Sequence, residues 1–195
     1  DFKTFNIKTY NKGVVNNDFT VKKLEEVTIL GEVFDAQPLL KSIFKTNNKK
    51  TFSKNFNEEI KINFKKALTG TNDDILNFAM IATINKGSFN KLSLKGDFSP
   101  TEIIEMSIYQ IDNSKKTLQI ISNRARPFVK HFDFIEGFEE GNLEYESIIY
   151  PKKTVSNLSI KNFKVSKVPA LAQLLTLASL QGIADTLSGE GIRFE

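Results

Sequence analysis

The stretch Glu59-Ile60-Lys61-Ile62-Asn63-Phe64-Lys65 decides the fold class, because polar and apolar side chains alternate in it without a break. Successive side chains of a β-strand point to opposite faces, so a period of two predicts a half-buried strand. The same period returns from Phe78 to Ile84. Asn85-Lys86-Gly87 follows, a sequence typical of a tight hairpin turn. The centre of the chain therefore predicts antiparallel β-structure.

Similar alternation extends outward from this centre in both directions, interrupted by turn residues such as Asn11-Lys12-Gly13, Ser99-Pro100 and Asp112-Asn113-Ser114. The further strands are expected within Phe5–Ile7, Phe19–Phe34, Leu92–Phe98, Ile104–Ile108, Leu118–Ile120, Leu143–Tyr150 and Leu158–Val165. We expect about nine or ten strands in one mainly β, antiparallel sheet, for which a meander is the simplest topology.

Helical spacing of apolar residues replaces the alternation in three places. Pro38 to Phe44 and Ala125 to Phe132 each predict a short helical turn. The longest helical segment is expected at about 168–188, as two short helices that end at Gly189-Glu190-Gly191. This helical insert is expected to belong to a single β-rich segment spanning residues 1–195, itself a fragment of a longer protein.

The composition is that of a folded chain, with 40% hydrophobic and 26% charged residues. It contains 17 Phe and no Trp, so many rings without a polar group need a dry environment, either a core or an apolar ligand. The absence of cysteine excludes disulfides and thiolate metal sites. Of the 27 basic residues only Arg124, Arg126 and Arg193 are arginine, and without an arginine cluster we expect no nucleic-acid partner.

No group of residues predicts catalysis. His131 is the only histidine, and it stands among Phe128, Phe132 and other apolar residues without a nucleophile in a recognisable arrangement. The acidic residues from Glu136 to Glu146 are expected in a loop and along a strand, where nothing buries them to separate their pKa values. We therefore predict no enzyme, no metal site and no cofactor. An acid/base hydrolase would need two carboxylates that converge in a cleft.

The carboxyl-terminal segment resembles a known family. Pro169-Ala170-Leu171-Ala172-Gln173-Leu174-Leu175 and Gly182-Ile183-Ala184-Asp185-Thr186-Leu187-Ser188-Gly189-Glu190-Gly191-Ile192 are similar to the AsmA-like carboxyl-terminal region of YhdP-like bacterial envelope proteins. Upstream, Gly31 to Leu40 looks like the strand-then-helix passage of that family, and Asn123 to Val129 lies where the family has a short helix. The acidic loop Glu136 to Gly141 and the abundance of Asn and Lys depart from the family pattern.

This resemblance implies a periplasmic protein, anchored to the bacterial inner membrane by a segment outside this chain. It implies a long sheet curved into an apolar groove that carries phospholipid, or another acyl-chain lipid, between the inner and outer membranes. The candidate groove residues are Ile60, Ile62, Phe64, Phe78, Met80, Ile84, Leu92, Leu94, Ile104, Met106, Ile108, Leu171, Leu174 and Leu175.

Two questions stay open from the sequence. The first is which face of each strand lines the groove, because Ile81 adjoins Met80 and Ile103 adjoins Ile104. The second is whether the chain is instead a scaffold or assembly factor for outer-membrane biogenesis, with envelope protein partners and a sheet whose core is closed. Lipid selectivity, transport direction, energy source and oligomeric state are not encoded in any recognisable pattern.

Overall fold

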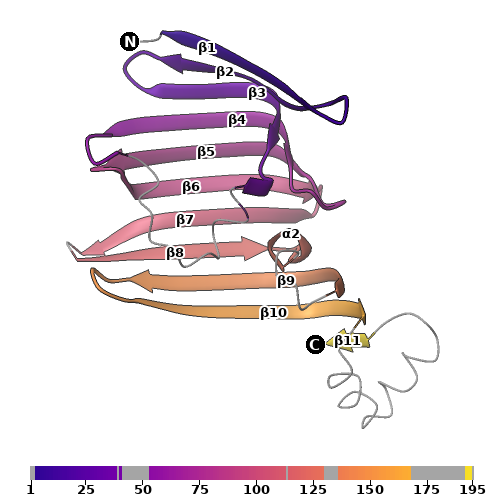
Figure 1. Ribbon diagram of the computed structural model, residues 1–195. Helices are drawn as coiled ribbons and strands as arrows, with labels where there is room; N and C mark the ends of the chain where they lie inside the picture. Colours follow the sequence, from indigo (N-terminus) through magenta and orange to yellow (C-terminus); the bar gives the residue numbers. More distant parts are fainter. Residues whose placement is uncertain are drawn as a thin grey trace.

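The computed structural model describes residues 3–38, 40, 53–112, 114–129, 136–167 and 192–194. In these ranges the chain forms one open sheet in which every strand lies beside its neighbour in the sequence (Figure 1). The strands are β1 (Thr4–Asn11), β2 (Val14–Lys23), β3 (Val27–Asp35), β4 (Glu58–Leu68), β5 (Ile75–Asn85), β6 (Ser88–Ser99), β7 (Glu102–Asp112), β8 (Lys115–Ser122), β9 (Glu136–Ile149), β10 (Thr154–Lys167) and β11 (Ile192–Phe194).

The predicted mainly β class and the predicted turns are confirmed. The two-residue turn of the β5–β6 hairpin is formed by Lys86 and Gly87, which both adopt the positive φ angles (50° and 72°) that such a turn requires. β6 ends at Ser99, immediately before the proline. The local rules of turn chemistry therefore set the lengths of the central strands.

The sheet is mostly antiparallel, as expected, but the expected antiparallel meander is wrong at one place, because β3 and β4 pair in parallel. β3 ends at Asp35 and β4 begins at Glu58, so the chain returns across the sheet between them before it pairs. Parallel neighbours need such a crossover, whereas a tight turn can only produce an antiparallel pair.

The acidic stretch that was expected as a loop is also different in the structure. Glu136 to Gly141 forms the first part of β9, and it pairs with β10. Gly137, Glu140 and Gly141 have positive φ angles of 67°, 58° and 88°. These left-handed residues interrupt the pleat without ending the strand, and the register with β10 continues through them without a shift.

Helix is scarce in the described ranges. One helical turn follows β3, where the Leu40 amide donates to the Ala36 carbonyl (3.0 Å). A second, α2 (Arg126–Val129), lies within the predicted Ala125–Phe132 turn, beside β9 (Figure 1). The helical insert predicted at about 168–188 lies outside the described residues. Among the residues that the structure describes, no helix is long and apolar enough to cross a membrane.

Candidate apolar binding face

One face of the sheet carries an apolar side chain on every strand from β1 to β10. Residues paired across neighbouring strands project to the same face, so the register defines a continuous line of side chains that we name the central row. Its members, in strand order, are Phe5, Val21, Ile29, Ile62, Met80, Leu94, Met106, Ile120, Tyr145 and Leu158. We call the face that bears this row the inner face.

Two flanking rows widen the inner face. On one side of the central row lie Val27, Ile60, Ala82, Leu92, Ile108 and Leu118, which are paired successively from β3 to β8. On β9 and β10 the same line continues with Ser147 and Ser156, whose hydroxyl groups are hydrogen-bonded (3.0 Å). The apolar face is therefore broad over β3 to β8 and becomes narrower at β9.

A cluster of phenylalanine rings occupies the other side of the central row on β2 to β5. Phe64 stacks on Phe34, with ring centroids 5.0 Å apart, and it lies 5.5 Å from Phe19 and 6.0 Å from Phe78. Gly31 is the cross-strand partner of both Phe19 and Phe64, and a Cβ atom at this glycine would overlap Phe19 and the Asp18 carbonyl. The glycine thus permits the rings to close over the backbone of β3.

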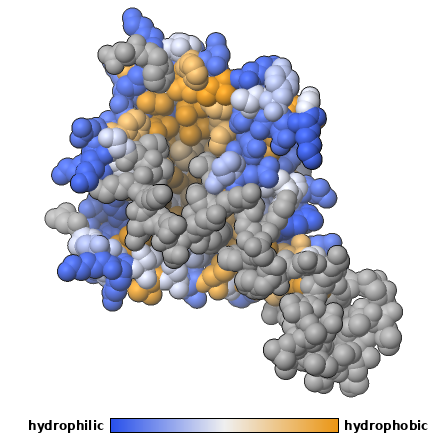
Figure 2. All heavy atoms as spheres, viewed as in Figure 1, coloured by the Kyte–Doolittle hydropathy of each residue, from blue (hydrophilic) through white to orange (hydrophobic). Residues whose placement is uncertain are grey.

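The structure places all eleven described candidate residues on the inner face. Half-buried members are Ile62, Met80, Leu94, Met106 and Ile108. Buried members are Ile60, Phe64, Phe78, Ile84, Leu92 and Ile104, each 7% exposed or less. Leu171, Leu174 and Leu175 lie outside the described residues. Figure 2 shows apolar side chains gathered over the upper strands, between hydrophilic side chains at the two strand ends.

The register also shows which residue of each adjacent apolar pair, Met80–Ile81 and Ile103–Ile104, lies on the inner face. Met80 pairs with Ile62 and Leu94 on the inner face, while Ile81 points to the opposite face and is 60% exposed. In the same way Ile104 is 2% exposed and Ile103 is 39% exposed.

Sequence reasoning missed several members of the central row. Val21, Ile29 and Ile120 lie in strands that the alternation had predicted, but these residues were not among the candidates. Tyr145 and Leu158 likewise extend the row across β9 and β10. The available signal was the same period of two in each of these strands, continued beyond the central hairpins.

The inner face is closed at one end of β8 and β9 by α2. Phe128 and Val129 are 1% and 2% exposed, and they belong to the same buried cluster as Ile120 and Leu143. Arg126 fastens the helix to the β4–β5 loop, because its Nε and Nη2 atoms donate to the two carboxylate oxygens of Asp73 (2.5 and 2.9 Å). That hydrogen bond raises the pKa of Arg126 against the opposing effect of burial.

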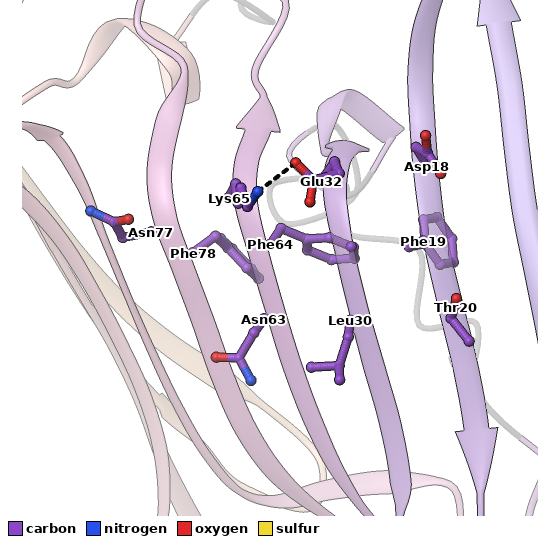
Figure 3. A pocket seen from close by; sticks show the side chains of 11 residues that line it. Asp18, Phe19, Thr20, Leu30, Glu32, Asn63, Phe64, Lys65, Asn77 and Phe78 are labelled. Atoms are coloured by element: carbon purple, nitrogen blue, oxygen red, sulfur yellow. Dashed lines mark ion pairs between the residues drawn. The ribbon is translucent and has the colours of Figure 1, made fainter.

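A hollow of about 660 Å³ lies along β2 to β5 (Figure 3). Its lining mixes the phenylalanine rings with Thr20, Leu30 and Asn63, which form a cross-strand row that alternates with the inner-face residues. The exposed Lys65 and Glu32 form an ion pair here (2.9 Å), so their charges compensate each other.

The acidic candidates do not converge in the described part of the chain. Glu144 and Glu146 are exposed on the outer face of β9, and Gln119 donates to Glu146 (3.3 Å). His131 and the side chain of Glu136 lie outside the described residues. Within the described ranges, no group of three or more His, Asp or Glu side chains could hold a metal ion. Comparisons with protein-family models, curated proteins and solved structures found no match for this chain.

Proposed function

We propose that this chain is a non-enzymatic segment of a bacterial envelope protein whose sheet curves into an apolar groove for phospholipid. The observation that carries the proposal is the central row, which is apolar or aromatic on ten successive strands. The AsmA-like resemblance supplies the rest of the proposal: a periplasmic location, an inner-membrane anchor and passage of lipid between the inner and outer membranes.

The dimensions of the central row support an acyl chain as the ligand. Neighbouring strands are about 4.8 Å apart, so nine intervals give a row of about 43 Å. The hydrocarbon core of a bilayer is about 30 Å thick, and one acyl chain covers about half of it. The row therefore exceeds the length of one acyl chain, which could shift along it from strand to strand and meet similar side chains throughout.

The energetics of transfer favour the same ligand. Each methylene group removed from water contributes about 0.8 kcal/mol, and the half-buried Ile62, Met80, Leu94 and Met106 offer apolar surface to replace the bilayer interior. Methionine is flexible and polarizable, so it adapts to chains of different shape. Passage along such a surface needs no bond to be made or broken, and the segment needs no catalytic group or cofactor.

The first test is mass spectrometry of lipids that co-purify with the protein from a bacterial host under native conditions. We expect stoichiometric phospholipid with the unmodified chain. Ile62→Asp or Met106→Asp should remove most of this lipid, because an acyl chain on the central row would then bury an unpaired carboxylate, which costs free energy. Ile81→Asp is the matched control, since Ile81 adjoins the row in sequence but is exposed on the other face.

The comparison is made on protein whose far-UV circular dichroism matches that of the unmodified chain. Equal lipid content in Ile62→Asp, Met106→Asp and Ile81→Asp would remove the central row from the lipid site. A folded protein that carries no lipid at all would contradict the proposed function.

One observation favours the alternative, an envelope scaffold or assembly factor with a closed core. Ile104, Ile120 and Leu143 are at most 2% exposed, and they cluster with Phe128 and Val129 of α2. This end of the inner face is a packed core rather than an open surface. A lipid-free and well-folded protein would favour the scaffold, and the partner would then be sought among envelope proteins by crosslinking.

A further inference from the structure

Lysines concentrate along the β5 to β10 part of one end of the sheet, where four turns of the described chain lie. Three of them are the β5–β6, β7–β8 and β9–β10 turns (Figure 1). The fourth turn, between β2 and β3, carries the carboxylates Glu25 and Glu26. Residues 85–88, 112–116 and 150–153 contain five lysines, Lys86, Lys115, Lys116, Lys152 and Lys153, and a single carboxylate, Asp112. We name these five residues the lysine end.

Most of this positive charge is uncompensated. Within the described residues, Lys86, Lys152 and Lys153 are exposed and none of them forms an ion pair, while Lys115 lies 3.6 Å from Asp112. Nearby on β4 and the β2–β3 turn, Glu58 is paired with Lys23 and Glu26 with Lys61, which leaves Glu59 and Glu25 as the other carboxylates.

The opposite end of the same strands is built differently. There Arg124 pairs with Glu102 (2.8 Å) and Arg126 with Asp73 (2.5 Å). Lys66 and Lys164 have carboxylate partners as well, at 2.8 and 3.4 Å. These four cations of the opposite end are thus paired, whereas Lys86, Lys152 and Lys153 of the lysine end form no ion pair among the described residues.

Aromatic and apolar side chains accompany the lysines. The Tyr150 ring lies 5.1 Å from the Lys153 ammonium group and 5.8 Å from that of Lys115. On β7, Tyr109 and Ile111 are 44% and 51% exposed near the same turn. Tyrosine and lysine side chains both suit the headgroup level of a bilayer. There the tyrosine ring is partly removed from water, and the lysine ammonium group contacts lipid phosphate.

We propose that the lysine end docks on a bilayer surface that contains anionic phospholipid. Turns on adjoining strand pairs form a row of tips suited to a flat surface, and lysine acts there as a point charge toward many headgroups. A nucleic acid is less suited, because its recognition uses arginine forks and base contacts that this end does not offer. Docking in this way concerns the rim of the sheet and is separate from acyl-chain binding on the inner face.

The experiment is co-sedimentation of the chain with vesicles of phosphatidylcholine alone and of phosphatidylcholine mixed with phosphatidylglycerol, at low and high salt. Binding should require phosphatidylglycerol and weaken with salt, because exposed charges are screened. The triple variant Lys86→Asn, Lys152→Ser, Lys153→Ser should lower the partition coefficient by about tenfold or more. Asparagine is chosen at Lys86 because it tolerates the positive φ angle of 50°.

A matched control variant carries Lys12→Asn, Lys95→Ser and Lys161→Ser. All three lysines are exposed, Lys12 also has a positive φ angle (49°), and both variants lower the formal net charge of +4 by three. We expect the control to retain vesicle binding and both variants to keep the far-UV circular dichroism of the unmodified chain.

Three results would overturn the docking surface. One is an equal loss of vesicle binding in the control variant, which would show that binding depends on net charge and not on the position of the lysines. Another is equal binding to vesicles of phosphatidylcholine alone. The third is binding of a short RNA or DNA duplex that is as tight as vesicle binding and is lost in the lysine-end variant. None of these results depends on co-purified lipid, so the proposed function is tested separately.

Discussion

Phe64 provides the sharpest test of how the inner face is held together. Its side chain is 5% exposed and contacts three other rings, with centroids at 5.0, 5.5 and 6.0 Å. Truncation of a buried phenylalanine costs about 3–5 kcal/mol, which includes the cavity left behind. The rings add about 0.5–1.5 kcal/mol for each well-oriented pair. For Phe64→Ala we therefore expect a loss of about 4 kcal/mol in the free energy of unfolding.

The assay is thermal and urea unfolding followed by far-UV circular dichroism, with Phe5→Ala as the matched control. Phe5 lies at the edge of the same face but is 56% exposed, so its truncation should cost less than about 1 kcal/mol. In a chain of this size, about 4 kcal/mol corresponds to a fall in Tm of about 12 °C.

Hydrogen exchange identifies where the loss occurs. We expect Phe64→Ala to reduce amide protection first in β2 to β5, which carry the four rings, and to leave β9 and β10 close to the unmodified chain. Equal destabilisation by Phe5→Ala and Phe64→Ala, or a cost below about 1 kcal/mol for Phe64→Ala, would refute the reasoning that the ring cluster is a packed core.

Three further predictions concern close approach and charge. Gly31→Ala should destabilise the chain by about 2 kcal/mol or more in urea unfolding, because the new methyl group overlaps a phenylalanine of β2; an unchanged midpoint would contradict the register there. Arg126→Ala should cost about 2 kcal/mol in the same assay, since Asp73, whose side chain is 9% exposed, loses its charged partner; retention of stability would show that α2 is held by packing alone. Burial lowers the pKa of Lys116 below the ordinary 10.5, whereas the hydrogen bond from Lys61 to Glu26 raises the pKa of Lys61 above it. Above the folded pKa of Lys116 the unfolded chain holds this proton more tightly than the folded chain does. The free energy of unfolding should therefore increase as pH rises through that folded pKa. Titration by NMR of labelled lysine side chains should find Lys116 losing its proton before Lys61, and the reverse order would count against the partial burial of Lys116.

Local chemistry was enough to predict the strands and several turns. The pleat forces residues two apart onto one face, so Ile60, Ile62 and Phe64 had to share a face whatever surrounds them. Turn residues such as Lys86-Gly87 act through their own backbone angles. These properties depend on a few consecutive residues, so they can be predicted without knowledge of the partner strands.

Pairing between distant segments was decided by the tertiary structure. Met80 and Ile81 are both apolar, so hydrophobicity alone does not show which of them faces inward. The register of β5 with β4 and β6 places Met80 on the inner face. Likewise β3 and β4 pair in parallel although residues 36–57 separate them in the sequence, and the Arg126–Asp73 contact joins residues 53 positions apart. A sequence fixes which side chains alternate because the pleat is local, but the identity of each neighbour depends on strand order and register, which only the folded sheet defines.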